Sequence, residues 1–456
     1  MPLLYIDLIE GRTPAEVRSL LDAVHDAVVD AFGVPPRDRY QVVRSHPAHE
    51  TIALDTGLGI DRTPSLVIVQ MVSRRRPRAL KQKFYELLAS SLAERCGLDP
   101  ADLIVSITEN EDGLVFRPRP GAVPHRRTDR GGATMTLHTR LTDFLAIRHP
   151  ILLAPMAMVS GGRLAAAVTA AGGLGLLGGG YGDAAWLRSE MAQAGGARVG
   201  YGFITWSLAH APELLDTVLA QQPPTVMLSF GDLEPFADRI HRAGVPVTAQ
   251  VQTLAQAQRA LDAGADIIVA QGGEAGGHGM SVRSTFTLVP EVVDLVAARA
   301  PATLVVAAGG VADGRGLAAA LALGADGVLV GTRFWAAAEA LVSAGAHRRA
   351  IAAGGDETIR TEVFDVVRQR DWPKGFDLRL VSNAWIQRWH DSPDELLARL
   401  PEAVTAYREG VAAEDFDVDT VLVGEAVGLI REVRPAADIV TAMVRDAARI
   451  LNRAGD

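Results

Sequence analysis

The stretch ALDAGADIIVAQGGEAGGHG, residues 260–279, decides the fold, because it contains one complete structural unit in three parts. Its first part is helix-like and ends at Gly264, and its second part, ADIIVA, is apolar and β-branched like a buried strand. The third part, residues 271–279, places five glycines around one acidic and one imidazole side chain. Glycine is used where the backbone takes unusual dihedrals or where a ligand approaches closely. The stretch therefore predicts a ligand-binding loop at the C-terminal end of a strand.

The same unit recurs in LALGADGVLV, residues 321–330, where Gly324 takes the place of Gly264. Such an internal repeat is typical of successive βα units. Eight apolar segments of this kind alternate with Ala- and Leu-rich helical segments: PILLAPM (150–156), GLGLLGG (173–179), RVGYGFITW (198–206), TVMLSFG (225–231), PVTAQVQ (246–252), DIIVAQGG (266–273), TLVVAAGG (303–310) and GVLVGTRF (327–334). They predict a (β/α)8 TIM barrel of α/β class with its active site on the C-terminal face. A doubly wound sheet is the alternative.

The first 114 residues show a shorter pattern. A strand (LLYIDLI) precedes a helix that Thr13 caps and Pro14 opens, and two strands (YQVVRSH and SLVIVQMVS), a helix (ALKQKFYELLASSLAERC) and a last strand (DLIVSITEN) follow. This β-α-β-β-α-β order predicts a small two-layer domain. Pro, Gly and Arg dominate residues 115–135, which indicates a linker. The predicted organisation is a domain at 1–114, a linker at 115–135, and a barrel at 136–456 whose C-terminal extension covers the barrel mouth or a subunit contact.

The composition excludes several classes of protein. The chain has 456 residues, of which 48% are hydrophobic and 22% charged, and a formal net charge of -9. This is ordinary for a globular protein and argues against a nucleic-acid-binding surface. The N-terminus lacks the features of a secretion signal, and no stretch is long and apolar enough for a membrane span. We expect a soluble, cytoplasmic protein that acts on small molecules, with Cys96 as a packing residue and no metal site.

Glycines also follow the last two strands of the predicted barrel. Gly309 and Gly310 come after one strand, and Gly331 with Thr332 after the other. Barrels of this type build a phosphate site there from backbone N–H groups, to which the Thr332 hydroxyl adds a donor. Tight turns alone are the alternative, but they do not require three glycine-bearing strand ends on one face.

The motifs APM (154–156), AGGLG (171–175), QGGEAGGHG (271–279), AAGGVADG (307–314) and LGADGVLVGTRF (323–334) resemble the nitronate monooxygenase family. The resemblance implies a TIM barrel that binds FMN. It implies flavin contacts from Met156, Gln250, Gln271, Ala275, Gly276, Gly277, Ala308, Gly309, Gly310, Gly331 and Thr332. The sequence departs from the family at Met158, where Gly is frequent, and at Gln250, where Lys is common.

The resemblance further implies that His278 lies beside the flavin. There it either takes a proton from a neutral nitroalkane or stabilises an anionic nitronate, and titration near neutral pH suits both roles. Glu274 is interpreted as a hydrogen-bond acceptor that shapes the loop. Barrels similar to IMP dehydrogenase need a loop cysteine, and no cysteine lies in this barrel. Flavin-dependent enoyl reductases share the EAGGH motif but consume NAD(P)H, and they stay open as an alternative.

The segments PLLYIDLIEGRT, FGVPPRDRYQVV, LDTGLG (54–59) and QMVSRRR resemble the tautomerase superfamily, in particular malonate semialdehyde decarboxylases. The resemblance implies that Pro2, exposed by removal of Met1, is the catalytic amine and that Asp38 assists it. It also implies that Arg74 and Arg76 bind a substrate carboxylate. Guanidiniums at this spacing share one face of a strand end and form charge-assisted bonds with carboxylates. A solvated charge run is the alternative for these arginines.

The two resemblances together imply a bifunctional enzyme. Oxidation of propionate 3-nitronate with O2 yields malonate semialdehyde and nitrite, and decarboxylation of that 3-oxo acid gives acetaldehyde and CO2. Tautomerase domains of this length typically form trimers, so we expect a homotrimer or a multiple of three. One alternative is that the barrel alone is catalytic and the small domain assembles the trimer. The other is an NAD(P)H-dependent flavin reductase barrel.

Overall fold

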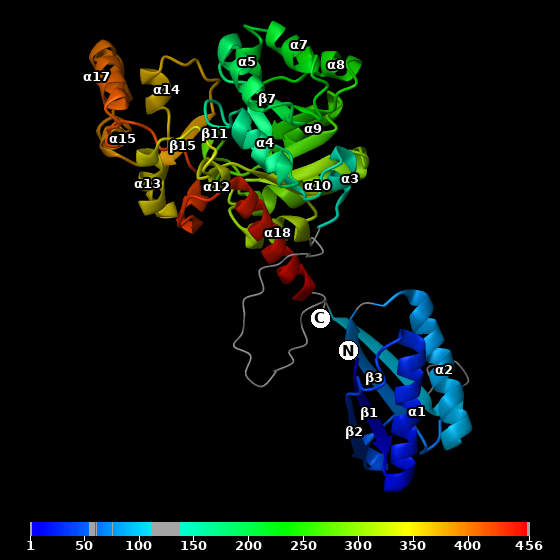
Figure 1. Cartoon of the computed structure of the whole chain (residues 1–456). Coiled ribbons are helices and arrows are strands. Elements are labelled where there is room, and N and C mark those ends of the chain that lie inside the picture. The colour runs from blue at the N-terminus through cyan, green and yellow to red at the C-terminus, as the bar shows by residue number, and fades with distance from the viewer. Residues whose placement is uncertain (1, 54–59, 61, 75, 111–136, 454–456) are drawn as a thin grey trace. The chain divides into compact units, whose positions relative to one another are not determined.

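The structure is a computed structural model that describes the chain except for residues 1, 54–59, 61, 75, 111–136 and 454–456 (Figure 1). The chain divides into two compact units, Met1–Arg130 and Gly131–Asp456. The division falls inside the predicted linker, residues 115–135, which lies outside the described residues. The exact domain bounds stay predictions.

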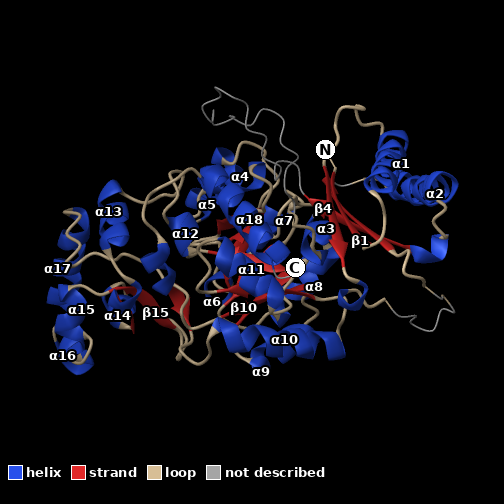
Figure 2. Ribbon diagram, turned by 90° about the horizontal axis from the view of Figure 1, so that it is seen from below, coloured by secondary structure: helices blue, strands red, loops and turns tan. Residues whose placement is uncertain are grey.

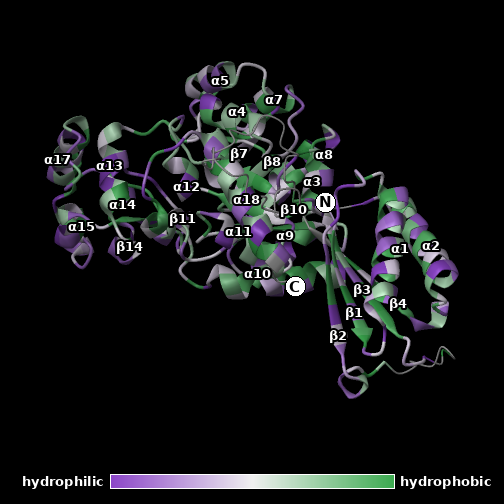
Figure 3. Ribbon diagram, turned by 60° about the horizontal axis from the view of Figure 1, so that its bottom comes forward, coloured by the Kyte–Doolittle hydropathy of each residue, from purple (hydrophilic) through white to green (hydrophobic). Residues whose placement is uncertain are grey.

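The N-terminal unit has the predicted order of elements: β1 (Leu3–Ile9), α1 (Pro14–Phe32), β2 (Gln41–His46), β3 (Val67–Arg74), α2 (Arg78–Cys96) and β4 (Leu103–Asn110). The strand order is β2-β1-β3-β4, in which β1 is parallel to β2 and antiparallel to β3, and β3 is parallel to β4. Alternate residues of β1 are buried, and α1 and α2 pack together beside the sheet (Figure 1). Both helices show hydrophobic and hydrophilic colours in Figure 3, as expected for helices with one buried face.

Helix α1 begins where the sequence predicts. The Thr13 side chain accepts a hydrogen bond from the N–H of Glu16, and the Glu16 carboxylate accepts one from the N–H of Thr13 at 2.7 Å. This reciprocal capping satisfies two donors that the first turn leaves free. At the other end Gly33 has a φ of 59°, in the left-handed region, and glycine takes this conformation without strain.

The C-terminal unit contains the predicted eight parallel strands, in the order β5-β13-β12-β10-β9-β8-β7-β6. Figure 2 shows the strands of this unit surrounded by helices. The strands are β5 (Ile151–Leu153), β6 (Leu176–Gly178), β7 (Gly200–Ile204), β8 (Val226–Ser229), β9 (Val247–Val251), β10 (Ile267–Gln271), β12 (Leu304–Ala308) and β13 (Gly327–Val330). The helices are α3 (Arg140–Leu145), α4 (Gly162–Ala170), α5 (Ala184–Gln193), α6 (Thr205–Leu208), α7 (Glu213–Leu219), α8 (Glu234–Arg242), α9 (Leu254–Asp262), α10 (Thr285–Arg299), α11 (Gly314–Ala322) and α12 (Thr332–Trp335).

A bridge between Leu152 and Leu174 brings the two ends of this strand order together, so the sheet forms a nearly closed barrel. The predicted strand 327–334 is too long. β13 ends at Val330, and the chain then turns into α12. The N–H of Trp335 donates to the carbonyl of Gly331 at 2.8 Å, which forms the first turn of this helix.

The repeat seen in the sequence has a structural basis. Gly264 and Gly324 have φ values of +80° and +92°, so both helices end in a conformation that favours glycine. Asp266 and Asp326 take equivalent places after them. Each carboxylate accepts a backbone N–H near the start of a neighbouring strand, at 2.8 and 2.9 Å respectively.

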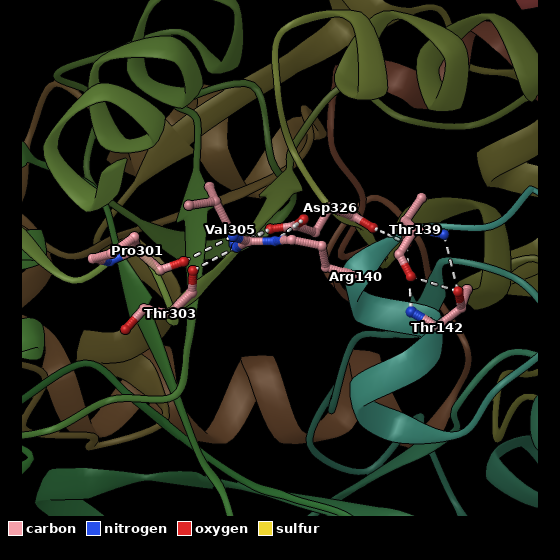
Figure 4. Close-up of polar contacts among 7 residues, drawn as sticks. All are labelled: Thr139, Arg140, Thr142, Pro301, Thr303, Val305 and Asp326. Carbon is pink, nitrogen blue, oxygen red and sulfur yellow. Dashed lines mark hydrogen bonds and ion pairs between the residues drawn. The ribbon is translucent and has the colours of Figure 1, made fainter. Parts of the chain in front are cut away.

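Asp326 also anchors α3 at the N-terminal end of the barrel (Figure 4). Its carboxylate accepts the Arg140 Nε–H at 2.9 Å, and its backbone carbonyl accepts the Thr139 hydroxyl at 2.7 Å. Arg140 donates further to the carbonyls of Pro301 at 2.8 Å and Thr303 at 2.7 Å. One helix N-terminus is thus bound to the starts of two strands.

We expect Asp326→Ala to lower the free energy of unfolding of the barrel by about 1–3 kcal/mol, because the buried N–H of Val305 loses its acceptor. Arg140→Ala should cost less, since that side chain is 52% exposed. Scanning calorimetry of the full chain measures both effects on the barrel transition. A larger effect of Arg140→Ala would contradict this ranking.

The rest of the unit extends beyond α12. It comprises α13 (Ala344–Ala352), β14 (Thr358–Thr361), α14 (Val363–Val367), β15 (Asp377–Val381), α15 (Ala384–Trp389), α16 (Pro393–Ala398), α17 (Leu400–Ala412) and α18 (Ala436–Arg453). The outer segment, defined as residues 343–423, forms a three-stranded sheet, β11-β15-β14, with β11 (Gly277–Gly279) of the glycine-rich loop. α18 returns to pack against α11 and α4. None of the helices in the described ranges is long and apolar enough to cross a membrane.

Candidate active site

A cavity of about 740 Å³ lies at the C-terminal ends of the barrel strands. The cavity is lined by every residue that the sequence predicted to contact a flavin: Met156, Gln250, Gln271, Ala275, Gly276, Gly277, Ala308, Gly309, Gly310, Gly331 and Thr332. His278 lines it too, as do Asp365, Arg368, Trp372 and Tyr407 of the outer segment. Residues of the C-terminal extension, which was expected to cover the barrel mouth or a subunit contact, thus line this cavity.

The glycines after β12 and β13 leave a set of backbone donors at the cavity. Gly309 and Gly310 have φ values of +100° and +72°, which side chains rarely adopt. Within the described residues, no hydrogen bond uses the backbone N–H of Gly309, Gly310, Gly331 or Thr332. The Thr332 hydroxyl oxygen accepts from the N–H of Gly424 at 2.9 Å, which leaves its own proton to donate. Free N–H groups and a hydroxyl at neighbouring strand ends fit a phosphate group.

The glycine-rich loop is held from outside by Arg360 on β14. Its guanidinium donates to the carbonyls of Gly273 at 3.0 Å, Ala275 at 3.2 Å and Gly279 at 2.9 Å. Burial lowers the pKa of Arg360 to about 10, so it keeps its charge at neutral pH. Glu274 accepts the N–H of Thr285 at 3.1 Å, as the sequence indicated for a loop-shaping acceptor. No local motif in the sequence identified Arg360.

Three glutamine amides form one hydrogen-bonded group beside the cavity. Gln271 Oε1 accepts from Gln250 Nε2 at 2.7 Å and from Gln252 Nε2 at 2.8 Å. Gln271 Nε2 in turn lies 3.4 Å from the carbonyl oxygen of His278. These amides are neutral, so Gln250 brings hydrogen-bonding capacity to this wall of the cavity and no positive charge.

His278 lies on β11 and is 8% exposed. Its Nε2 is 3.0 Å from both carboxylate oxygens of Asp365, which lies on α14 and is also buried. Burial lowers the pKa of His278 below its ordinary value of 6.5, and the hydrogen bond to Asp365 opposes this shift. The imidazole is therefore neutral at pH 7.

Aromatic side chains surround this imidazole. The Trp372 ring is stacked on His278, with centroids 3.4 Å apart and planes 9° apart, and Phe230 meets both rings edge-on. Tyr181, beside Trp372, lines the same cavity, and burial raises the pKa of its phenol. Aromatic rings thus form the wall next to His278, and the Arg370 guanidinium lies 4.2 Å from the centroid of the Tyr181 ring.

The predicted residues of the N-terminal unit lie at one end of its sheet. Leu3 pairs with Val72, so Pro2, which is buried, is next to the end of β3 where the arginines follow. On the other side of β1, the N–H of Leu4 donates to the carbonyl of Tyr40 at 2.9 Å, so the segment that follows Asp38 lies beside the start of β1.

Of the two arginines at the end of β3, the structure describes the side chain of Arg76 but not that of Arg74. Arg76 is 8% exposed, and its guanidinium lies 5.1 Å from the centroid of the Phe32 ring. A run of charges exposed to solvent does not explain why the Arg76 side chain is buried. The Arg74 side chain and residues 54–59 lie outside the described part of the chain.

Comparison with known proteins gives a family for each unit. The family described as nitronate monooxygenase matches residues 138–198 and 207–446, and two tautomerase families match residues 2–59 and 38–113. A nitronate monooxygenase of Neurospora crassa is 34% identical over 67% of this chain and 90% of that protein. The probable tautomerase YrdN of Bacillus subtilis is 53% identical over 25% of this chain and 87% of that protein. The structure of FabK from Thermotoga maritima is similar, with a TM-score of 0.61 and 30% identity over 70% of this chain and 99% of that one.

Proposed function

The chain belongs to the nitronate monooxygenase family and carries a tautomerase-family domain at its N-terminus, and on this premise we propose that it is a bifunctional enzyme. The barrel oxidises a nitronate, preferably propionate 3-nitronate, to malonate semialdehyde and nitrite with FMN and O2. The N-terminal domain then decarboxylates malonate semialdehyde to acetaldehyde and CO2. One observation carries the proposal for the barrel: buried His278 lies in a cavity that all the predicted flavin contacts line.

FMN fits the donor set of this cavity. Its phosphate would be held by the N–H groups of Gly309, Gly310 and Gly331 and by Thr332, and its ring system by Met156, Gln250 and the loop 275–277. A bound flavin supplies the electron transfer that amino-acid side chains lack. The protein's own residues bind and orient the substrate, exclude water and handle its proton.

His278 is the group that handles this proton. A neutral nitroalkane must lose a proton from the carbon that bears the nitro group, and a neutral imidazole can accept it. A nitronate has already lost that proton and needs only its negative charge stabilised. The aromatic wall of Trp372 and Phe230 excludes water from this step.

The N-terminal domain acts through Pro2 once Met1 is removed. The cationic secondary amine polarises the aldehyde oxygen of malonate semialdehyde, Asp38 assists, and Arg74 and Arg76 bind the carboxylate. The C–C bond to the carboxylate breaks, CO2 leaves, and the electron pair remains as an enolate that takes up a proton. The sheet register, which brings Pro2 next to the end of β3, supports this assignment.

We also propose a homotrimer, or a multiple of three, assembled through the N-terminal domain. Native mass spectrometry of the full chain reports the subunit number, the loss of Met1 and the bound flavin in one measurement. A monomer or a dimer would contradict the proposed assembly. It would not contradict the proposed oxidation by the barrel, which is tested separately.

The FMN site predicts the effect of a glutamate at Gly310. We expect Gly310→Glu to purify without flavin, because it forces a side chain into a φ of +72° and adds a negative charge beside the phosphate. Gly195→Glu is the matched control, since that glycine has a φ of +61° and open space around it. Flavin absorbance per chain and circular dichroism measure cofactor content and folding. Full FMN content in Gly310→Glu, or FAD in the wild-type protein, would refute the site.

A further inference from the structure

We propose that Asp365 is the positioning residue that makes His278 a directed base, by holding the proton of the neutral imidazole on Nε2 and leaving Nδ1 to accept the proton of the substrate. This inference rests on the proposed oxidation of nitro compounds by the barrel. It adds a residue outside the barrel and assigns the reacting nitrogen atom.

The geometry of the pair fixes the tautomer. Nε2 lies 3.0 Å from both oxygens of the Asp365 carboxylate. An ionised carboxylate only accepts hydrogen bonds, so the nitrogen that faces it must carry the proton. In a neutral imidazole the other nitrogen, Nδ1, then holds the lone pair, and it has no hydrogen-bond partner within the described residues.

Three neighbouring elements keep the ring in this orientation. Trp372 stacks on one face of the imidazole. The backbone of β11 pairs with β15, with His278 opposite Leu378. Asp365 is held in place because it lies on α14, and its carboxylate is buried beside the ring. Turning the ring out of its plane would break both the hydrogen bond to Asp365 and the stack on Trp372, and a half-turn within the plane would break the hydrogen bond.

The proton transfer balances within this arrangement. The C–H bond next to the nitro group breaks, an N–H bond forms at Nδ1, and the electron pair moves onto the nitro oxygens to give the nitronate. The ring becomes an imidazolium, and the Asp365 carboxylate faces the new positive charge. Arg360 and Arg368 are the other charged groups that act on this ring, and both disfavour the imidazolium, so Asp365 is its counter-charge.

Histidine-selective ¹⁵N NMR of the full chain tests the assignment without relying on activity, with His278→Ala to identify the signal. We expect a protonated Nε2 and a bare Nδ1 in the wild-type protein at pH 7. In Asp365→Asn the pKa of His278 should fall further, because the hydrogen bond and the negative charge that raise it are lost. Asp371→Asn, an exposed carboxylate of the same outer segment, is the control and should change nothing. A proton on Nδ1, or an unchanged pKa in Asp365→Asn, would overturn the proposal.

Kinetics give a second readout of the same variant. Asp365→Asn should lower turnover of a neutral nitroalkane by up to the roughly 10²–10⁴-fold that a general base contributes, and much less with preformed nitronate. The acid limb of its pH profile should move to lower pH. Equal losses on both substrates together with lost flavin would show a merely structural role and overturn the proposal. If the wild-type protein oxidises neither substrate, the proposed function fails, and the NMR signals still decide the role of Asp365.

Discussion

Replacing His278 by alanine should lower the turnover of a neutral nitroalkane by roughly 10²–10⁴-fold, the usual contribution of a general base, while the FMN content stays near that of the wild-type protein. The side chain lies at the cavity, and within the described part of the chain it makes no hydrogen bond to a predicted flavin contact. Because burial holds the pKa of His278 below 6.5, the wild-type rate should fall only as the pH drops through that lowered value. Protonation removes the base there, and His278→Ala should lack this inflection.

Steady-state rates with nitroalkane and with preformed nitronate measure the effect. A smaller loss on nitronate identifies His278 as the base, whereas equal losses indicate that it stabilises the anion. His138→Ala is the control, since that side chain is 74% exposed. Unchanged turnover on both substrates would make His278 structural, and NADH oxidation faster than nitronate oxidation would favour a reductase.

Blocking the amine of Pro2 should abolish the formation of acetaldehyde from malonate semialdehyde. An uncleaved N-terminal tag turns the secondary amine into an amide, which carries no charge with which to polarise the aldehyde. The enolate left by CO2 then lacks the cationic amine that would stabilise it. Nitrite release by the barrel should continue, because the described residues that line its cavity belong to the second unit.

A C-terminal tag is the matched control, and it should leave both activities unchanged. An enzyme-coupled assay for acetaldehyde and a colorimetric assay for nitrite follow the two reactions separately. Acetaldehyde formation that survives the block would remove Pro2 from the mechanism.

The barrel could be predicted because its information is local. β10 and β13, for example, are short apolar runs between a glycine at the end of a helix, Gly264 or Gly324, and a glycine at the start of a loop. The outer sheet could not be predicted in this way. β11 has only the residues GHG, and its place in a sheet depends on pairing with β15, a partner distant in the sequence.

The same distinction applies to the site. The flavin contacts are implied by the resemblance of the sequence motifs to the nitronate monooxygenase family and stay predictions, although the structure brings all of these residues to one cavity. Asp365 lies 87 positions from His278 in a segment without a recognisable motif, and Arg360 holds the glycine-rich loop from the same segment. A buried ion or hydrogen-bond partner from another element depends on tertiary packing, which periodicity does not encode.

Whether the two domains act in sequence is tested by supplying propionate 3-nitronate to natively purified protein and quantifying the products. We expect nitrite and acetaldehyde in equal amounts, with malonate semialdehyde only as a transient. Stoichiometric accumulation of malonate semialdehyde without acetaldehyde would contradict this expectation, and the N-terminal domain would then be an assembly module or a tautomerase for another substrate.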